Sequence, residues 1–210
     1  MYGYFDPTQY EDRFVVIGCG AIGSHVAEIL TRLGIKHITL YDFDFVTEHN
    51  ITNQLYTAED VNKLKTEALA NYLKKINPDL KLIVKGKYTD QPLSGHVILA
   101  VDSVDVRKEI INNNITNIYI KTWTDFRMGL TEAQAYLYTD PKNLLKTLDF
   151  THEEAMQNTP VSPCGTTLNV NTTVKCITAL GIQNLINHLL KKPNKHIVTI
   201  DLNKLDILTI

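Results

Sequence analysis

The chain has 210 residues, with 21 lysines and arginines against 23 aspartates and glutamates and a net charge of −2. Because 44% of its residues are hydrophobic, this length suffices for one well-buried domain and is short for two, so we expect a single domain over residues 1–210. The balanced charge and scattered lysines exclude the basic stripe that follows a phosphate backbone, so no nucleic-acid partner is expected.

Cysteine usage and the first residues indicate the expected compartment. The three cysteines, Cys19, Cys164 and Cys176, form no CxxC pair and do not cluster with the seven histidines, so a zinc site is not expected. An odd cysteine count favours a reducing compartment. The N-terminal residues lack a basic region followed by an apolar core, and no stretch is long enough to cross a bilayer. We therefore expect a soluble, cytoplasmic protein with no membrane partner.

The first segment, residues 1–12, is aromatic and acidic, and Pro7 prevents a helix through it. Two interpretations of this segment stay open. It can be an irregular arm packed against the sheet or a partner, or it can be a frayed terminus.

A strand followed by a glycine-rich turn opens the regular part of the chain. Four hydrophobic residues, Phe14 to Ile17, precede a GxGxxG pattern formed by Gly18, Gly20 and Gly23. The first glycine permits a tight turn, the second lets backbone amides approach a phosphate, and the third lets the following helix pack on the strand. A glycine pattern in this strand-to-helix context predicts a nucleotide-binding site.

An amphipathic helix and a second strand follow the turn. Apolar side chains from Ile22 to Leu33 recur at helical spacing, and Gly34 stops the helix. The first residues of this helix, Ala21 and Ile22, would present their amides to the anion. The strand Ile38 to Tyr41 then delivers Asp42, about twenty residues past the turn, where a carboxylate accepts hydrogen bonds from ribose hydroxyls.

Strands continue to alternate with helices along the rest of the chain. We expect helices at Glu59 to Ile76, Val104 to Asn113 and Leu168 to Leu190, strands at Lys81 to Tyr88, Val97 to Val101, Ile118 to Thr122 and Met128 to Thr139, and a hairpin within His196 to Ile210. The alternating pattern of residues 128–139 is typical of a half-buried strand that runs antiparallel. Residues 140–163, with three prolines, are too many for a plain connection, so we expect them to be mobile or functional.

This alternation predicts an α/β fold of Rossmann-like type. The expected architecture is a mostly parallel sheet with helices on both faces and a few antiparallel strands towards the C-terminus. Ligands in such sheets bind at the carboxyl ends of the strands. Asp42 and Asp102, which follow the second and fourth predicted strands, would both lie at that edge.

An ordered set of residues beyond the turn resembles the ThiF family, the adenylyltransferases of thiamine and molybdopterin biosynthesis and the adenylation domains of ubiquitin-activating enzymes. The residues that carry the resemblance are Asp42 to Val46, Asn50, Gln54, Lys65, Asn77, Pro78, Asp102 and Arg107. The match runs from about Phe14 to Leu190. A glycine pattern alone would be weak, but several motifs in order are specific.

The resemblance implies an ATP- and Mg²⁺-dependent adenylyltransferase that acts as a homodimer. Such enzymes join the C-terminal carboxylate of a small ubiquitin-like or sulfur-carrier protein, one with a Gly-Gly tail, to AMP and release pyrophosphate. A carboxylate is already ionised at neutral pH, so no general base is required. Catalysis then consists mainly of positioning and of neutralising charge on the triphosphate.

The resemblance also implies roles for particular residues. The residues implied to bind the nucleotide are Gly18, Gly20, Ala21, Ile22, Gly23, Asp42, Asp44, Asn50, Gln54 and Lys65. Among them, Asp42 would bind the ribose, and Asn50 and Lys65 the phosphates. Lys65 and Asp102 would be catalytic, and Asp102 would hold a Mg²⁺ ion that bridges phosphate oxygens. Cys164 occupies the family's crossover region, where some relatives use a cysteine for thioester or persulfide chemistry.

One position departs from the family's pattern. Relatives usually carry an arginine immediately before the glutamine at Gln54, where it steadies the phosphates, whereas this chain has Asn53. Losing one preorganised charged donor costs on the order of a hundredfold in rate. Either another cation substitutes, with Lys63, Arg13 and Arg107 as candidates, or the protein binds nucleotide without turning it over well.

Several of these residues also have structural interpretations. Asp102 can be a helix N-cap, Lys65 a solvated helix lysine and Asp44 a turn residue. Arg107 is more typical of a structural residue that pairs with an aspartate. Cys164 can be a buried small hydrophobe instead of a reactive thiol, and Cys19 and Cys176 are expected to pack in the interior.

Two other functions stay open beside adenylyl transfer. A non-catalytic ThiF-like module that partners an active subunit would explain Asn53. An NAD-dependent oxidoreductase would follow from the glycine turn alone, but no dehydrogenase-like set of donors accompanies the turn.

Overall fold

An eight-stranded sheet with the strand order β3-β2-β1-β4-β5-β6-β7-β8 runs through the molecule. The structure is a computed structural model that describes residues 4–151, 153–154 and 170–210. The strands are β1 Phe14–Ile17, β2 His37–Tyr41, β3 Lys81–Lys85, β4 Gly95–Leu99, β5 Ile120–Met128, β6 Glu132–Tyr138, β7 Ile197–Asp201 and β8 Asp206–Thr209. Strands β1 to β5 are parallel, and β6, β7 and β8 continue the sheet antiparallel.

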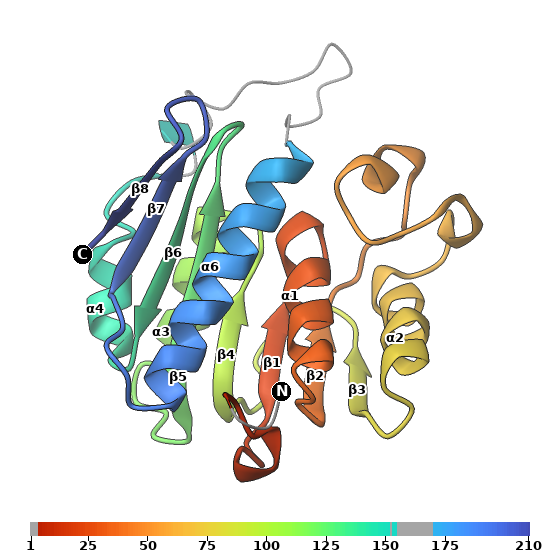
Figure 1. The fold of residues 1–210 in the computed structure, drawn as a ribbon, viewed down its shortest axis with the longest axis horizontal. Helices are drawn as coiled ribbons and strands as arrows, with labels where there is room; N and C mark the ends of the chain where they lie inside the picture. The colour runs from red at the N-terminus through yellow and green to blue at the C-terminus, as the bar shows by residue number, and fades with distance from the viewer. Residues whose placement is uncertain (1–3, 152, 155–169) are drawn as a thin grey trace.

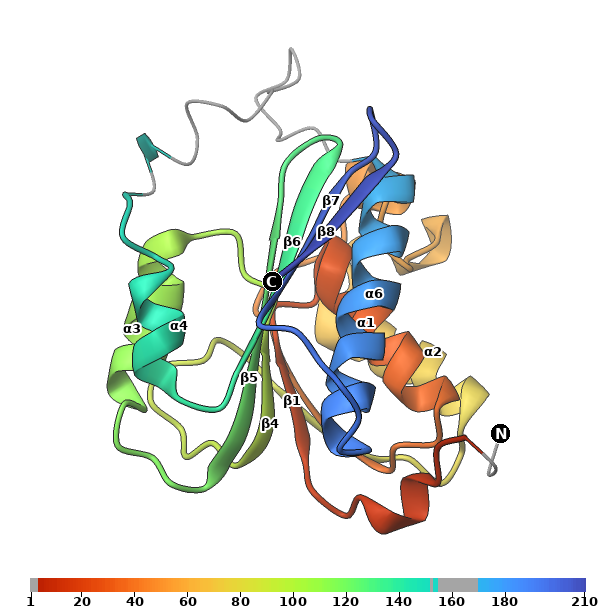
Figure 2. The same ribbon diagram turned by 60° about the vertical axis from the view of Figure 1, so that its left-hand side comes forward.

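Helices cover both faces of this sheet (Figures 1 and 2). The α-helices are α1 Ala21–Arg32, α2 Lys65–Ile76, α3 Val104–Asn113, α4 Pro141–Lys146 and α6 Asn171–Leu189, and the short 3₁₀ helices are η1 Pro7–Gln9, η2 Glu48–Thr52 and η3 Ala58–Asp60. With the sheet seen edge-on in Figure 2, α1, α2 and α6 lie on one side and α3 and α4 on the other. The predicted Rossmann-like fold, with its parallel sheet and antiparallel C-terminal strands, is confirmed.

Strand β1 shows why a run of hydrophobic residues forms the centre of this sheet. Its four side chains are at most 3% exposed, and they alternate between the two faces. Phe14 and Val16 join the hydrophobic core beneath α1 and α6, whereas Val15 and Ile17 join the core beneath α3 and α4. A strand that is covered on both faces needs a continuous apolar run instead of an alternating one.

The order of the strands places the glycine turn at the point where the chain changes direction across the sheet. Strand β1 pairs with β2 on one side and with β4 on the other. The chain builds β2 and β3 on the first side and then crosses to β4 and β5 on the second. In open α/β sheets this switch point, at the carboxyl ends of the strands, is where ligands bind.

Several predicted boundaries are confirmed, and others are wrong for identifiable reasons. Helix α3 has the predicted bounds, and the predicted hairpin is β7 and β8, joined at residues 202–205. The helix expected from Glu59 begins only at Lys65, because residues 61–64 form a turn in which Asn62 has a φ of 69° and Leu64 bridges to Phe45. Strand β3 ends three residues before the end of the predicted strand 81–88, β4 lies two residues before the predicted strand 97–101, and β5 begins two residues after the start of the predicted strand 118–122.

Two further differences lie beyond α3. Strand β5 continues to Met128, six residues past its predicted end, and β6 begins at Glu132 and not at Met128. The connection expected over residues 140–163 contains α4, which begins at Pro141 with Asp140 as its N-cap. Pro is favoured in the first turn of a helix, where its missing N–H costs nothing. Residues 155–163 of that connection, and Cys164, lie outside the described residues.

From Tyr4 onward, the N-terminal segment packs on the side of the sheet that carries α1 and α6. Phe5 is 1% exposed and stacks on Tyr10, whose hydroxyl donates a hydrogen bond to the Leu189 carbonyl at 3.1 Å. The interpretation as a packed arm is therefore confirmed for residues 4–12. Among the described residues no helix is long and apolar enough to cross a membrane.

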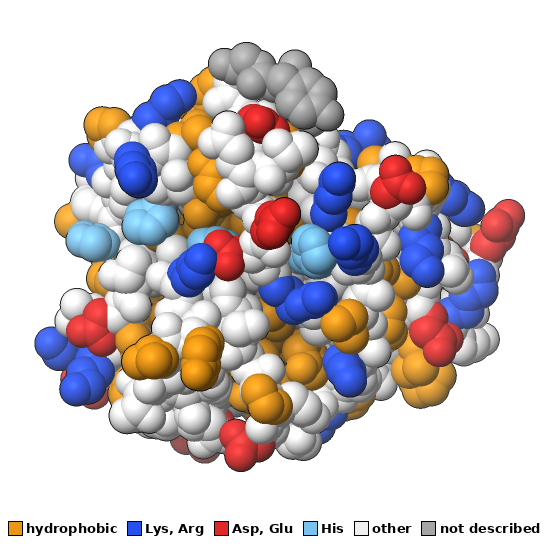
Figure 3. All heavy atoms as spheres, turned by 90° about the horizontal axis from the view of Figure 1, so that it is seen from below, with side chains coloured by type: hydrophobic (Ala, Val, Ile, Leu, Met, Phe, Trp, Pro, Cys, Tyr) orange, Lys and Arg blue, Asp and Glu red, His pale blue; other side chains and the backbone are white. Residues whose placement is uncertain are grey.

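The edge of the sheet where the strands begin carries no dominant charge. Figure 3, which views the molecule from that side, shows basic and acidic side chains interspersed with hydrophobic ones. The features expected to bind a ligand lie at the opposite edge, at the carboxyl ends of the strands.

Candidate functional site

The glycine turn between β1 and α1 is built by close backbone contacts. Gly18 has a φ of +93°, and a Cβ atom there would lie 2.6 Å from the carbonyl oxygen of Ala100. A Cβ atom at Gly23 would lie 1.8 Å from the carbonyl oxygen of Gly18. Both positions therefore require glycine, the first for the turn and for contact with the end of β4, and the second for contact between α1 and β1.

Gly20 differs from the other two glycines because nothing constrains it from within the protein. A Cβ atom at Gly20 would meet no atom within 4 Å among the described residues. Gly20 is also the N-cap of α1, and among the described residues no side chain makes a capping hydrogen bond there. Among the described residues, the first turn of α1, at Ala21 and Ile22, thus begins with no side-chain cap and with open space beside Gly20, which is an arrangement that can bind an anion.

Asp42 follows β2 and touches the glycine turn. Its Oδ2 accepts a hydrogen bond from the Cys19 amide at 2.6 Å, and its Oδ1 accepts one from the Asp44 amide at 2.8 Å. A carboxylate has about four acceptor positions, so two remain for other donors. The contacts hold the carboxylate at the carboxyl edge of the sheet, in the position that we expect for ribose recognition.

A buried lysine completes this group of residues. Lys65, the first residue of α2, is 7% exposed, and its Nζ donates a hydrogen bond to Oδ2 of Asp44 at 2.8 Å. The Lys65 amide also donates to the Asp44 carbonyl oxygen at 2.9 Å. The interpretation of Lys65 as an ordinary solvated lysine is therefore wrong. Because the Asp44 side chain is 51% exposed, an anionic ligand can approach the ammonium group beside it.

Tyr56 joins the glycine turn to α2, and sequence reasoning missed it. Its hydroxyl lies 2.6 Å from the Cys19 carbonyl oxygen and 3.2 Å from that of Lys65. Cys19 itself is fully buried, and burial, together with the negative charge of Asp42, raises the pKa of its thiol well above the ordinary value. The thiol therefore stays neutral and packs beneath the turn, as predicted.

The segment that contains Asn53 and Gln54 is followed by Leu55, whose amide donates a hydrogen bond to the Ser24 hydroxyl of α1 at 3.4 Å. Asn50 Oδ1 accepts a hydrogen bond from the Thr47 amide at 3.0 Å and so caps η2. Asn53, which ends η2, is 9% exposed. The Oε1 atom of Gln54 is buried and finds no hydrogen-bond partner among the described residues. Buried polar atoms are normally satisfied, so this amide oxygen indicates a donor that these residues do not supply.

Asp102 lies in the loop that follows β4. This residue is exposed, and the N-cap of α3 is the next residue, Ser103, whose hydroxyl accepts a hydrogen bond from the Val106 amide at 3.3 Å. The interpretation of Asp102 as an N-cap is therefore wrong. Since the Ala100 amide donates to the Ile17 carbonyl at 2.8 Å, the loop is tied to the glycine turn. Among the residues that the structure describes, the Asp102 carboxylate makes no hydrogen bond or ion pair, and it lies at the carboxyl edge.

Arg107 is structural, as the sequence suggested. It is 6% exposed and forms an ion pair with Asp125 of β5, and its other terminal nitrogen donates to the Val101 carbonyl oxygen. Burial lowers the pKa of Arg107, whereas the charge of Asp125 opposes this shift. Arg127 bonds the second oxygen of Asp125, with its Nε at 2.8 Å.

The three cations proposed to replace the missing arginine lie in different places. Arg13 precedes β1, at the other edge of the sheet, and donates to the Thr39 hydroxyl at 3.0 Å. Arg107 is committed to Asp125. Arg13 is therefore excluded by its position, and Arg107 is excluded by its ion pair. Lys63, which lies two residues before α2 and pairs with Asp60 at 3.1 Å, is half exposed, so it remains a candidate.

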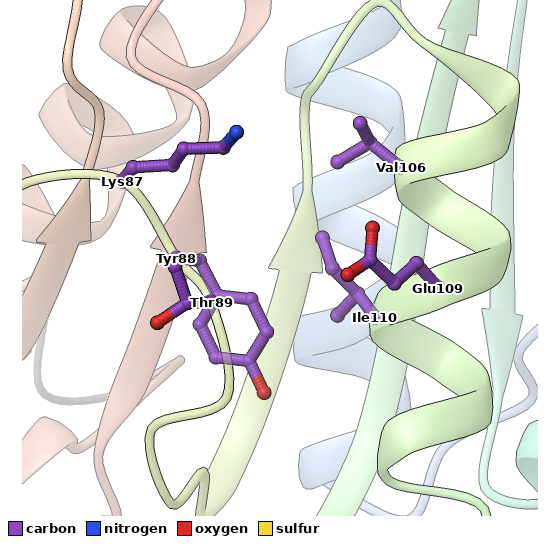
Figure 4. Close-up of a pocket in the computed structure, with 6 residues that line it drawn as sticks. All are labelled: Lys87, Tyr88, Thr89, Val106, Glu109 and Ile110. Carbon is purple, nitrogen blue, oxygen red and sulfur yellow. The ribbon is translucent and has the colours of Figure 1, made fainter.

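A small hollow of about 120 Å³ lies beside the site, between the loop after β3 and helix α3 (Figure 4). Lys87, Tyr88 and Thr89 line it on one side, and Val106, Glu109 and Ile110 on the other. The ammonium group of Lys87 lies 5.6 Å from the ring centroid of Phe43, which immediately follows Asp42 and is 58% exposed. An exposed aromatic ring beside the ribose position can stack on a planar base.

The structure thus brings many of the predicted site residues to one edge of the sheet, and one of them lies outside the described residues. Hydrogen bonds and an ion pair connect the glycine turn with Asp42, Asp44 and Lys65, and the next loop of the same edge carries Asp102. Cys164 lies outside the described residues.

Comparison with known proteins identifies the family. The sequence model of the ThiF family matches residues 10–210. The Arabidopsis thaliana protein "Ubiquitin-like modifier-activating enzyme 5" is 40% identical over 72 residues, which cover 34% of this chain and 17% of that protein. "Adenylyltransferase and sulfurtransferase UBA4" from Yarrowia lipolytica is 41% identical over 66 residues, which cover 31% of this chain and 17% of that protein. The matched stretches are thus a small part of these relatives.

Solved structures share the fold. The structure described as "Crystal structure of E. coli MccB + ATP" has a TM-score of 0.77 at 21% identity and covers 97% of this chain and 65% of its own. The structure described as "Crystal Structure of SeMet PaaA" has a TM-score of 0.73 at 15% identity, with 97% and 65% covered. At these identities the likeness establishes the fold alone.

Proposed function

The chain belongs to the ThiF family, and from that premise we propose that it is an ATP-dependent adenylyltransferase formed by a single domain. It would activate the C-terminal carboxylate of a small protein as an acyl-adenylate. Its family relatives include proteins named for activating ubiquitin-like modifiers and for adenylyl transfer. One observation carries the proposal: the open amides of α1, the Asp42 carboxylate and the buried Lys65 meet at one edge of the sheet.

The arrangement of these groups supports a particular placement of ATP. The phosphates would lie over Gly20 and the first turn of α1, where no side chain among the described residues blocks them. Lys65 would leave Asp44 or share its ammonium group with the phosphates. Asp42 would accept the ribose hydroxyls, and the base would lie towards Phe43 and Lys87.

The acidic residues of the site fit a Mg²⁺ ion that is held mainly by the substrate. No group of three or more histidine, cysteine, aspartate or glutamate side chains that could hold a metal occurs in the described part of the chain. Mg²⁺ in nucleotide enzymes is typically bound through one or two carboxylates and the substrate's phosphates. The exposed carboxylate of Asp102 fits that pattern. When bound, the ion would neutralise charge on the phosphates.

The proposed reaction needs positioning more than proton transfer. The carrier's carboxylate attacks the α-phosphorus of ATP, a new oxygen–phosphorus bond forms, and pyrophosphate leaves. Because the nucleophile is already ionised, no general base takes part. The backbone amides of α1 and the Lys65 ammonium group would stabilise the negative charge that moves to the leaving pyrophosphate.

Asn53 lowers the expected rate of adenylyl transfer, and it favours the alternative that the chain is a non-catalytic module. It stands where relatives usually carry an arginine. Among the three candidate cations, Arg13 lies at the other edge of the sheet and Arg107 is paired with Asp125, so Lys63 is the candidate that remains. If Lys63 does not contact the phosphates, the chain is a non-catalytic module that partners an active subunit. Restoring the arginine with Asn53→Arg discriminates between the two: a raised rate supports a catalytic site, and no ATP binding even then supports the scaffold.

The partner and assembly are proposed from the family. The partner would be a small ubiquitin-like or sulfur-carrier protein with a Gly-Gly tail, and the chain would act as a homodimer. For Cys164, which lies outside the described residues, a reactive thiol that carries a covalent intermediate and a buried small hydrophobe both stay open. The predicted cytoplasmic location rests on sequence features, namely the cysteine count and the character of the N-terminal residues.

Pyrophosphate exchange tests the proposal. The purified chain, mixed with each of a panel of small proteins that end in Gly-Gly, should exchange labelled pyrophosphate into ATP with at least one of them. Asp102→Ala should abolish the exchange. Thermal-shift measurements with ATP and with NAD separate this function from an oxidoreductase: stabilisation by NAD and not by ATP would contradict adenylation.

A further inference from the structure

A buried carboxylate, Asp125, connects two arginines just below the carboxyl edge of the sheet. Its side chain is 0% exposed, Arg107 of α3 binds Oδ1, and Arg127 binds Oδ2 with its Nε at 2.8 Å. The pairing of β5 with β4 places Asp125 beside Leu99, the last residue of β4. The carboxylate therefore lies next to the strand end from which the Asp102 loop departs.

Each arginine uses its remaining nitrogens to hold a different backbone segment. Arg107 donates to the carbonyl oxygen of Val101, the residue immediately before Asp102. Arg127 donates to the carbonyl oxygen of Thr147 at 2.7 Å and to its hydroxyl at 2.6 Å, at the end of α4. Of the two arginines, Arg107 is the one that contacts the Asp102 loop among the described residues.

The Asp102 loop depends on backbone contacts for its position. The Ala100 amide donates to Ile17, the Arg107 amide donates to the Ser103 carbonyl at 3.2 Å, and the Arg107 guanidinium holds Val101. The Asp102 side chain is exposed and makes no hydrogen bond of its own among the described residues. Its direction is therefore set by the residues on either side of it, two of which contact Arg107.

Burying the charges of Asp125 and Arg107 costs desolvation free energy, which indicates that the group formed by Asp125, Arg107 and Arg127 contributes more than stability. A buried ion pair of this kind is often replaceable by apolar residues of similar volume without loss of stability. The neighbours of Asp125 along β5 that fill the two cores, Trp123 and Phe126, are apolar and 1% exposed. A planar guanidinium that bridges a carboxylate and a carbonyl gives fixed geometry, which a hydrophobic contact does not.

We infer that Arg107 and Asp125 are positioning residues that aim the Asp102 carboxylate at the nucleotide-bound metal. This inference rests on the proposed function, because it takes Asp102 as the carboxylate that meets Mg²⁺. Asp125 orients Arg107, Arg107 fixes the Val101 carbonyl, and the fixed carbonyl sets the backbone from which Asp102 projects. Residues that orient a metal ligand typically change metal affinity by about 10–100-fold when altered.

The test measures Mg²⁺ dependence and not turnover. ATP binding is followed by titration calorimetry at increasing Mg²⁺ concentration, which gives both the affinity without the ion and the Mg²⁺ concentration at half-maximal effect. Arg107→Lys and Asp125→Asn should raise that concentration about tenfold or more and leave the metal-free affinity within about twofold. Arg107→Lys keeps a positive charge beside Asp125, so it carries the test even where Asp125→Asn folds poorly.

A matched substitution on the other branch supplies the control. Arg127→Lys makes the same chemical change beside the same carboxylate but alters the contact with Thr147, so it should leave the Mg²⁺ dependence unchanged. Asp102→Ala is measured in parallel. A shift with Asp102→Ala but none with Arg107→Lys would overturn the inference, as would equal shifts with Arg107→Lys and Arg127→Lys. No shift with Asp102→Ala would overturn the metal role in the proposed function, and the inference with it.

Discussion

Two alanine substitutions in the glycine turn should separate what the turn contributes to folding from what it contributes to binding. A methyl group at Gly23 would lie 1.8 Å from the Gly18 carbonyl oxygen and 3.3 Å from a methyl of Val16. Real Cβ atoms do not approach this closely, so α1 would have to move away from β1 by more than about 1 Å in a tightly packed interior. A methyl group at Gly20 would meet nothing within 4 Å among the described residues.

The magnitudes follow from these distances. Overpacking of this kind costs about 3 kcal/mol, so Gly23→Ala should lower the melting temperature by about 6–12 °C for a chain of this size. Because a methyl group at Gly20 meets no atom among the described residues, Gly20→Ala should lower stability less than Gly23→Ala does. Its methyl group would instead occupy the space over α1 where the phosphates are proposed to lie, and should weaken ATP binding about tenfold or more.

Urea denaturation and titration calorimetry with ATP on both variants provide the measurement. The reasoning predicts one variant with a stability defect and another with a binding defect. It would be refuted if Gly20→Ala bound ATP as tightly as the unaltered chain, or if Gly23→Ala proved as stable as the unaltered chain.

Two further predictions concern the effect of Lys65 on ATP binding and the effect of His96 on the pH dependence of stability. Lys65→Met should weaken ATP binding about tenfold or more at low ionic strength, with little change in urea stability, because its partner Asp44 is half exposed and stays hydrated. Burial lowers the pKa of His96 to about 4, so between pH 6.5 and pH 4 the unfolded chain binds the extra proton, and the free energy of unfolding should fall by about 3 kcal/mol over that range. Denaturation at a series of pH values checks this slope; His96→Gln should flatten it, and an unchanged slope in that variant would contradict the assignment.

The local part of the fold was predictable because its signals lie close together in the sequence. The run Phe14 to Ile17, the glycine pattern and Gly34 each act within a few residues, and β1, α1 and their turn are found where expected. Asp42 was placed for the same reason, since the end of β2 fixes it beside the Cys19 amide. Such features depend on backbone geometry that residue type alone dictates.

Features that depend on contacts between residues far apart in the sequence were not predictable. Asp125 and Arg127 interrupt the apolar pattern of β5, so the strand seemed to end at Thr122, whereas Arg107 compensates the buried carboxylate from 18 residues away. Tyr56 gave no local signal either, because its two acceptors are Cys19 and Lys65. Apolar residues at helical spacing predicted a helix from Glu59. One of them, Leu64, instead lies in a turn and bridges to Phe45.

The Asp102 carboxylate illustrates what the fold adds to a motif. Its place after a strand was evident from the sequence, but an N-cap was an equally simple explanation until Ser103 was found to cap α3. Because Ser103 caps the helix, the exposed carboxylate of Asp102 remains at the edge of the sheet where the glycine turn lies. Its surroundings, and not its residue type, make it a candidate metal ligand.

An oxygen-transfer experiment tests adenylation most directly. A Gly-Gly-tailed carrier protein that supports pyrophosphate exchange is labelled with heavy oxygen in its C-terminal carboxylate, incubated with ATP and this chain, and treated with hydroxylamine. Attack of the carboxylate on the α-phosphorus places one labelled oxygen in the bridge, and hydroxylamine then attacks the carbonyl carbon and releases AMP. The account predicts pyrophosphate and AMP that carries one heavy oxygen; release of ADP, or AMP without the label, would contradict it.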